Sequence, residues 1–238
     1  TPLTALLFAE VCQQAELPAG VVNIVTGDGS TGALIVNHPG IDKIAFTGST
    51  EVGKLLMMQC APTVKKVALE LGGHAPFIVF EDADIDSAVA GAMFAKYRNA
   101  GQACVAANRF YVHKKVHDEF VEKFAAASKS IKVGYGLEPG VTQGPLIDEQ
   151  ALAKVQRHIA DALEKGAKLI TGGKLSEIGG TFFEPTVIAN ANNSMTIAYE
   201  ETFGPVAPVI PFESDDEVVR LANHSQFGLA SYFYSRDI

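Results

Sequence analysis

The chain has little basic charge and no long apolar run, and each shortage excludes a class of partner. Its 238 residues carry 19 Lys and Arg against 27 Asp and Glu, which gives a net charge of −8. Nucleic-acid partners need a basic patch, and the basic side chains here are scattered through an acidic chain. Apolar runs such as 77–80 are far shorter than the ~20 residues of a membrane-spanning helix. We therefore expect neither a nucleic acid nor a membrane as a partner.

Cysteine is also scarce, and the few cysteines present do not form a framework. Cys12, Cys60 and Cys104 match neither the spacing of a zinc site nor that of a redox pair, and the N-terminal residues lack the basic start of a secretory signal. These features predict a reduced, cytoplasmic protein. The histidines show no metal-ligand spacing, so we expect no bound metal. Five of them are expected at the surface or on helix faces: His74, His113, His117, His158 and His224.

What the sequence does contain is an ordinary globular composition, 47% hydrophobic and 19% charged, with alternating helical and strand patterns. Helices are expected at 3–16, 33–37, 50–59, 84–97, 116–132, 148–166 and 215–223. Strands are expected at 21–25, 43–46, 64–71, 77–80, 109–113, 169–171, 182–188, 206–211 and 231–234. Strands separated by helices of these lengths predict parallel βαβ units and an α/β fold.

The Gly72-Gly73 pair is the expected domain boundary, because a predicted strand ends there. This divides the chain into residues 1–71 and 72–238. The first residues already follow a helical pattern, and the last residues stop just after a strand-like run. We therefore expect the chain to be a fragment of a longer protein.

Two glycine-containing turns join a predicted strand to a predicted helix. Residues 27–32 fit the pattern G-x-G-x-x-G, and residues 48–53 place glycine and hydroxyl groups at the start of the next helix. Backbone N–H groups at such positions bind pyrophosphate, although a plain turn also collects glycines. Two such turns in successive units favour a bound nucleotide over two well-capped helices.

Cys104 and Glu70 are the residues whose surroundings best fit catalysis. Cys104 lies among small and amide residues, which would leave its sulfur accessible and offer N–H groups to an oxyanion. Cys12 and Cys60 lie in amphipathic helices and are expected to be buried. Glu70 lies between apolar residues at a strand end, where desolvation would strengthen it as a base. A Glu on the solvent face of an edge strand is an equally good interpretation.

Four motifs in order along the chain resemble the aldehyde dehydrogenase superfamily. They are FTGSTEVG at 46–53, ELGG at 70–73, GQAC at 101–104 and EETFGP at 200–205. Within the superfamily the chain most resembles succinate-semialdehyde dehydrogenases, on the stretches 70–80, 96–102 and 227–232. The resemblance implies the later part of a Rossmann-type NAD(P)-binding domain at 1–71. It also implies a catalytic α/β domain, truncated at its C-terminal end, at 72–238.

The resemblance further implies a role for each site residue. Cys104 is the nucleophile that forms a thiohemiacetal and then a thioester, and Glu70 activates the water that hydrolyses the thioester. NAD or NADP is the cofactor, and the family does not hold it by the G-x-G-x-x-G turn, which weakens that interpretation of residues 27–32. The implied cofactor contacts are Gly48 and Ser49 near the pyrophosphate, Gly29 and Ser30 at the adenine end, Leu71, and Glu201 and Phe203 at the nicotinamide ribose.

Arg98 precedes Cys104 by six residues, and there the resemblance implies a guanidinium that binds the remote carboxylate of the substrate. A surface salt bridge is the alternative. The implied substrate is a small carboxylated aldehyde, most simply succinate semialdehyde, and the full-length protein is expected to form a homodimer or homotetramer. Ala106 stands where some members carry a second cysteine, so no local disulfide switch is expected. As a fragment, the chain should bind nucleotide weakly and turn over poorly.

Three other interpretations are compatible with the sequence. Another superfamily member would oxidise a different ω-carboxylated or simple aldehyde, and an inert protein of the same fold would carry an unreactive Cys104. The third is a thiol hydrolase that pairs Cys104 with His74 or His113. It is disfavoured because no hydrolase signature is present and because the nucleotide turns would be unexplained.

Overall fold

A computed structural model describes residues 2–237 and divides the chain into two compact units, Thr1–Leu71 and Gly72–Ile238. Both units combine helices with parallel strands, which confirms the predicted α/β class. The roles expected for the two units stay predictions at this point. Within residues 2–237, no helix has the length and hydropathy needed to cross a membrane.

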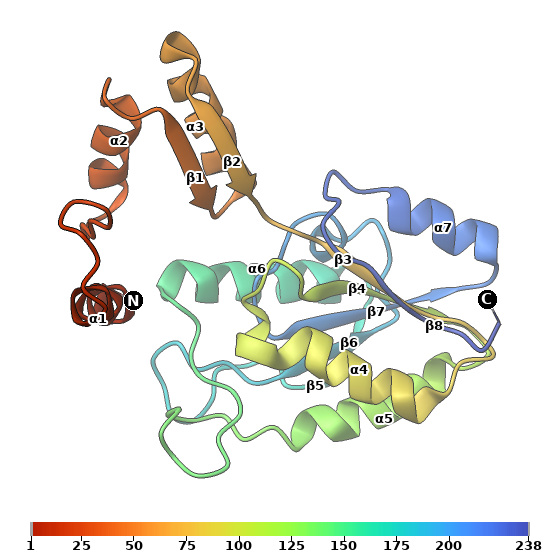
Figure 1. Ribbon diagram of the computed structural model, residues 1–238. Coiled ribbons are helices and arrows are strands. Elements are labelled where there is room, and N and C mark those ends of the chain that lie inside the picture. The colour runs from red at the N-terminus through yellow and green to blue at the C-terminus, as the bar shows by residue number, and fades with distance from the viewer. Residues whose placement is uncertain (1, 238) are drawn as a thin grey trace. The chain divides into compact units, whose positions relative to one another are not determined.

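The first unit is built around two parallel strands (Figure 1). Its elements are α1 (Pro2–Gln14), α2 (Gly29–Asn37), β1 (Lys43–Thr47), α3 (Thr50–Cys60), the 3-10 turn Ala61–Thr63 and β2 (Lys66–Glu70). The register runs from Lys43 opposite Lys66 to Thr47 opposite Glu70, so both strands end at the same edge. A small core joins α2, β1 and α3 through Val36, Ile44, Leu56 and Cys60.

The strand predicted at 21–25 is wrong. These residues form bends and extended chain, and no segment in the described part of the chain pairs with them. Val21 and Val25 are 65% and 70% exposed, and the N–H of Val21 donates to the carbonyl of Pro18. A β-branched run becomes a strand only where a neighbouring strand takes up its backbone hydrogen bonds. A local sequence pattern does not report whether that neighbour exists.

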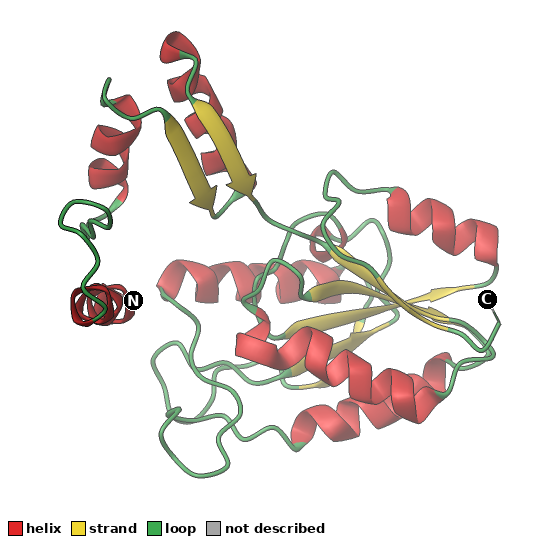
Figure 2. Cartoon of the chain, viewed as in Figure 1, coloured by secondary structure: helices red, strands yellow, loops and turns green. Residues whose placement is uncertain are grey.

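The second unit is a six-stranded sheet with helices on both faces (Figure 2). Its helices are α4 (Ile85–Tyr97), the 3-10 turn η2 (Arg98–Gly101), α5 (His117–Lys129), α6 (Glu149–Glu164), the 3-10 turn η3 (Thr196–Ala198) and α7 (Asp215–Asn223). Its strands are β3 (Ala75–Val79), β4 (Ala107–His113), β5 (Lys168–Thr171), β6 (Thr186–Ala189), β7 (Val206–Phe212) and β8 (Tyr232–Tyr234). The order is β5-β6-β7-β4-β3-β8, and only β5 runs antiparallel to its neighbour.

The two faces of this sheet carry separate cores. Helices α4 and α5 pack on one face, and α6 and α7 pack on the other (Figure 1). Successive side chains of a strand point to opposite faces; on β4, Phe110 and Val112 therefore contact the first core while Tyr111 contacts the second. All three are 0% exposed, so β4 is a fully buried central strand.

The candidate site residues lie just outside the strand ends. In the first unit, 48–49 and Leu71 follow the carboxyl ends of β1 and β2. In the second unit, the segments 72–74, 98–106 and 200–205 directly precede β3, β4 and β7. Because β3, β4 and β7 are parallel neighbours, these three segments meet at the amino-terminal edge of one sheet.

Candidate active site

The loop that carries Cys104 begins with an unusual backbone. Helix α4 ends at Tyr97, and Asn99, Ala100 and Gly101 then adopt φ values of 55°, 56° and 72°. A left-handed conformation costs an L-residue about 1–2 kcal/mol, and such strain persists only where the surroundings impose it. Ala100 is 2% exposed, and the side-chain amide of Asn99 donates to the carbonyl of Gln102 at 2.9 Å. Packing and this hydrogen bond therefore hold the turn in place.

Two glycines let the three segments approach one another. A Cβ on Gly101 would lie 2.2 Å from the carbonyl oxygen of Gly204, and a Cβ on Gly73 would lie 2.0 Å from the carbonyl oxygen of Cys104. Both positions are therefore restricted to glycine by the backbone of a neighbouring segment. Gly72 and Gly73 of the ELGG motif consequently form one packed cluster with the GQAC and EETFGP motifs.

Cys104 lies in a turn at the surface of this cluster. The N–H of Ala106 donates to the carbonyl of Ala103 at 3.0 Å and closes the turn around the cysteine. Cys104 is unpaired and half-buried, whereas Cys12 and Cys60 are 9% and 2% exposed. Cys104 is thus the most exposed of the three cysteines, as the sequence predicted.

Gln102 fixes the loop to the start of α6. Its side-chain oxygen accepts from the N–H of Ile147 at 2.9 Å, and its amide nitrogen donates to the carbonyl of Pro145 at 3.2 Å. Helix α6 begins directly after these residues, with Asp148 as its N-cap. The loop that carries Cys104 is therefore held by the start of a regular helix.

Glu201 points back toward the start of β3. Its Oε1 accepts from the N–H of Gly73 at 3.0 Å. Burial raises the pKa of Glu201, while the hydrogen bond from Gly73 and the positive charges of Lys154 and Lys96 oppose that rise. The carboxylate is half-buried, so it can still meet a ligand from solvent.

The rest of the EETFGP segment is held from α6. The buried ring of His158 lies 3.1 Å from Oε2 of Glu200 and 3.2 Å from the hydroxyl of Thr202. Phe203 then adopts a φ of 51° and is half-buried. The backbone at Phe203 is thus strained, and His158 holds the residues that precede it. Strained backbone of this kind clusters at ligand-binding sites.

Arg98 opens the 3-10 turn that leads to Cys104. It is exposed, and its guanidinium lies over the ring of Phe94, 5.5 Å from the centroid. Within residues 2–237 it makes no ion pair or hydrogen bond, so the surface salt bridge considered as its alternative role is not present. The guanidinium is free to pair with an anion.

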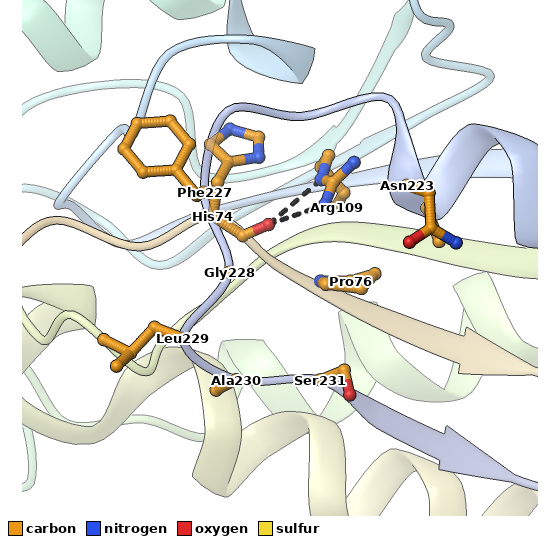
Figure 3. A pocket seen from close by; sticks show the side chains of 10 residues that line it. His74, Pro76, Arg109, Asn223, Phe227, Gly228, Leu229, Ala230 and Ser231 are labelled. Atoms are coloured by element: carbon orange, nitrogen blue, oxygen red, sulfur yellow. Dashed lines mark hydrogen bonds between the residues drawn. The ribbon is translucent and has the colours of Figure 1, made fainter.

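A separate pocket of about 260 Å³ lies beside β3 and β4 (Figure 3). Arg109, only 2% exposed, donates from Nε and Nη2 to the carbonyl of His74 at 3.0 and 2.9 Å. The ring of His74 stacks on Phe227 at 5.8 Å, and Leu229 lines the same pocket. Burial and the Arg109 charge lower the pKa of His74 to about 3, so this imidazole is neutral.

The expected placement at the surface or on helix faces is wrong for His74 and His113, which are buried outside any helix, whereas His117 and His158 lie on α5 and α6 with their side chains buried. His74, His113, His117 and His158 are 2%, 7%, 6% and 0% exposed. An imidazole can be buried when its nitrogens find partners, as His113 does with the carbonyl of Glu213 at 3.2 Å. Neither His74 nor His113 hydrogen-bonds to Cys104 in the described chain, which removes the support for a thiol hydrolase.

In the first unit, the start of α3 offers free backbone donors. The hydroxyl of Ser49 caps the helix by accepting from the N–H of Val52 at 3.2 Å, and the N–H of Gly48 donates to the carbonyl of Glu70. The first-turn N–H groups of Thr50 and Glu51 have no partner among residues 2–237. Free N–H groups at a helix N-terminus bind phosphate.

The start of α2 differs from α3. Asp28 accepts from both the N–H and the hydroxyl of Ser30, at 2.9 and 2.6 Å, and these bonds lower the pKa of Asp28. Asp28 is therefore the N-cap of α2 and already bonds to Ser30, and its charge makes this end a poor phosphate site. Gly29 instead lines an apolar groove of about 480 Å³ between α2, β1 and α3. A flat, largely apolar ring fits such a groove.

Glu70 and Leu71 end the first unit. Leu71 packs on α3. Its Cδ2 lies only 2.5 Å from the place that a Cβ on Gly53 would occupy. Glu70 is exposed, so the desolvation expected for it is not present. Glu70 and Cys104 belong to different units, and their pairing in catalysis stays a prediction.

Comparison with known proteins decides the family of the chain. The model of the aldehyde dehydrogenase family matches residues 1–238. The chain belongs to this family. The four motifs that carried the resemblance are thus motifs of an aldehyde dehydrogenase chain, and the packed cluster of Gly73, Gly101, Cys104 and Glu201 is the corresponding part of its fold.

Individual aldehyde dehydrogenases resemble the chain over its whole length. A 3-sulfolactaldehyde dehydrogenase of Pseudomonas putida is 59% identical, and a glutarate-semialdehyde dehydrogenase of Pseudomonas aeruginosa and an NADP(+) succinate-semialdehyde dehydrogenase of Escherichia coli are each 54% identical. The solved succinate-semialdehyde dehydrogenase of Burkholderia pseudomallei is 57% identical, with a TM-score of 0.98. Each match covers 100% of this chain and 49–50% of the other protein. The chain therefore spans about half the length of these relatives.

Sequence reasoning missed several residues around this aldehyde dehydrogenase site. Lys96 and Arg109 are buried basic residues, and nothing in the local pattern marks a long charged side chain as buried. The apolar groove was also missed. The groove is lined by apolar residues of α2 and α3 such as Ile35, Val52 and Leu55, which the structure leaves 42%, 38% and 45% exposed.

Proposed function

We propose that the full-length protein is an NAD(P)-dependent aldehyde dehydrogenase that oxidises an aldehyde with a remote anionic group, with succinate semialdehyde converted to succinate. One observation carries this proposal. The half-exposed thiol of Cys104 sits on a strained loop that packs, through Gly73, against the segment holding the carboxylate of Glu201. A reactive thiol and a cofactor-directed carboxylate in one rigid cluster are what thiol-dependent aldehyde oxidation requires.

Cys104 performs the covalent chemistry. Its thiolate attacks the aldehyde carbon and forms a C–S bond, and the carbonyl oxygen becomes an oxyanion. The backbone N–H groups of Cys104 and Val105 have no hydrogen-bond partner in the described residues and are suited to stabilise that charge. After oxidation, the acyl group is a thioester on Cys104. Glu70 takes a proton from the attacking water, which releases the acid and restores the thiol.

The residues of the chain fit NAD(P) at three points. The apolar groove beside Gly29 suits the adenine ring, and the free N–H groups that follow Gly48 and Ser49 suit the pyrophosphate. Glu201 would bind the ribose hydroxyls next to the nicotinamide, with Phe203 beside them and Leu71 packed on α3. When bound, NAD(P)+ supplies the acceptor for the hydride that leaves the substrate carbon. Ser30 would lie at the adenine end, where its N–H and hydroxyl already donate to the N-cap Asp28.

Arg98 would select the substrate. Its exposed, unpaired guanidinium can pair bidentately with a carboxylate. Replacing Arg98 by Ala in the full-length protein should raise KM for succinate semialdehyde by about 10–100-fold, the range of one lost charge-assisted pair. KM for butyraldehyde, which lacks the carboxylate, should change by less than about twofold. Steady-state kinetics with NAD and with NADP measures both values.

The control is Lys168→Met, which removes one positive charge from an exposed strand and should leave both KM values unchanged. An equal loss for the two aldehydes in Arg98→Ala would contradict the substrate assignment. A full-length protein that oxidises no aldehyde with either cofactor would overturn the function itself. The relatives also include enzymes named for glutarate semialdehyde and 3-sulfolactaldehyde, and a sulfonate pairs with a guanidinium as a carboxylate does, so these aldehydes belong in the same assay.

The proposal includes the compartment and the oligomeric state of the full-length protein. All three cysteines are unpaired, which supports a reducing compartment such as the cytoplasm. A homodimer or homotetramer is the expected assembly.

A further inference from the structure

Phe94 is a large apolar side chain on the solvent face of a helix. It lies near the end of α4 and is 68% exposed. The residues through which α4 packs on the sheet, such as Ala92 and Tyr97, are 0% and 4% exposed. Among the described residues, Phe94 belongs to neither of the two cores of this sheet. The packing of the second unit therefore does not require an aromatic side chain at this position.

The ring of Phe94 contacts the side chain of Arg98. The two residues are four positions apart, so they lie on the same face at the end of α4. The guanidinium carbon of Arg98 lies over the ring, 5.5 Å from its centroid, which is within the range of a cation–π contact. Within residues 2–237 no carboxylate pairs with Arg98. The ring of Phe94 is therefore the described group that orients this guanidinium.

The backbone of Arg98 is fixed, whereas its side chain is not. Arg98 leads directly into the left-handed residues 99–101, and Gly101 packs against the carbonyl of Gly204. The backbone of Arg98 is thus held relative to Cys104, six residues further on. A free arginine side chain loses much rotamer freedom when it binds an anion. A ring that orients the guanidinium before the substrate arrives reduces that loss.

A ring contact suits this task better than an ion pair within the protein. A carboxylate beside Arg98 would neutralise its charge and occupy its N–H donors. A ring face attracts the cation without a negative charge of its own. The guanidinium thus keeps the charge and the planar set of donors with which it forms a bidentate pair with a substrate carboxylate.

We propose that Phe94 is a positioning residue that holds the Arg98 guanidinium ready for the remote anionic group of the aldehyde. The inference rests on the proposed function, in which Arg98 binds that group, and extends it to a residue outside the four motifs. Loss of the ring should weaken the binding of anionic aldehydes and leave the chemical step at Cys104 unchanged.

The test is steady-state kinetics of full-length Phe94→Leu with succinate semialdehyde and butyraldehyde at saturating NAD+ or NADP+. Leucine is also apolar but has no ring face. KM for succinate semialdehyde should rise about two- to fivefold, the range of one cation–π contact at an exposed site. The kcat for this aldehyde and KM for butyraldehyde should change less than about 1.5-fold. Phe94→Tyr keeps the ring and should retain the wild-type KM.

Two further variants separate the ring contact from packing and folding. A trifluorinated phenylalanine at position 94 keeps the shape of the ring but removes most of the negative charge from its face, so it should raise KM as Phe94→Leu does. Phe233→Leu is the matched control. Phe233 is 69% exposed, and no cation of the described chain lies over its ring, so its loss should leave both KM values unchanged.

The Arg98→Ala background decides whether the two residues act together. There Phe94→Leu should leave KM for succinate semialdehyde unchanged, because the guanidinium that the ring orients is gone. The inference is overturned by an unchanged KM in Phe94→Leu, by an equal rise for both aldehydes, by an equal loss in Phe94→Tyr, or by a rise that persists without Arg98. The proposed function survives these outcomes if Arg98→Ala alone impairs succinate semialdehyde selectively. An unselective Arg98→Ala contradicts the substrate assignment itself.

Discussion

Single residues explain why the loop that carries Cys104 has one conformation. Gly101 combines a φ of 72° with a neighbouring carbonyl 2.2 Å from the site of its missing Cβ, and Gly73 meets the carbonyl of Cys104 in the same way. Ala100 adopts a left-handed conformation without being glycine, held by burial. The loop is therefore strained, and the strain is balanced by close packing against 72–73 and 204.

Gly101→Ala should both destabilise the protein and misplace the nucleophile. The left-handed backbone alone costs about 1 kcal/mol for Ala, and the clash with Gly204 displaces the loop. A displacement of this kind should lower kcat by at least about tenfold. Thermal unfolding and kcat of the full-length protein measure the two effects. Gly136→Ala, where the added Cβ meets nothing within 4 Å, should leave both unchanged, and a fully active Gly101→Ala would refute the packing argument.

The sequence predicted the exposed cysteine but not the buried basic side chains. Cys104 was separated from Cys12 and Cys60 by its small and amide neighbours, and its greater accessibility is confirmed. The burial of Lys96 and Arg109 was not predicted, because a long basic side chain reads as a surface residue until the segments that cover it are known.

The helices and strands followed from periodicity and caps. Helix α7 has the predicted bounds, and Asp84, Asp148 and Ser214 cap their helices through N–H groups three residues on. The strand expected at 182–188 is shorter, at Thr186–Ala189, and that at 21–25 is not formed. These strand errors arise because a strand depends on a partner that lies far away in the sequence while a helix carries its own hydrogen bonds. The helix expected at 33–37 was predicted too short, since it begins at Gly29 within the glycine-containing turn.

The cap of α6 can be tested locally. Asp148 accepts from the N–H of Ala151 at 2.8 Å, and Asp148→Ala should cost about 1 kcal/mol in the first turn. Amide hydrogen exchange in residues 149–152 should then become about fivefold faster, while exchange in α4 stays unchanged. Asp148→Ser keeps an oxygen acceptor and should restore most of the protection. If Asp148→Ala exchanges at the wild-type rate, the capping argument fails.

The chain spans about half the length of the relatives it matches and consists of two compact units. The first unit offers an apolar groove and a free helix N-terminus, and the second offers the thiol, the carboxylate and the unpaired guanidinium. The family followed from four motifs in order and is confirmed. The exact aldehyde did not, since relatives named for three different aldehydes share more than half of the residues.

The reaction of Cys104 tests the central claim most directly. The folded full-length protein is treated with substoichiometric iodoacetamide, and mass spectrometry follows alkylation of Cys104, Cys12 and Cys60 while dehydrogenase activity is assayed on the same samples. We predict that Cys104 reacts at least about tenfold faster than the two buried cysteines. We also predict that activity falls in proportion to Cys104 alkylation. Faster alkylation of Cys12 or Cys60, or full activity after Cys104 is alkylated, would contradict the claim.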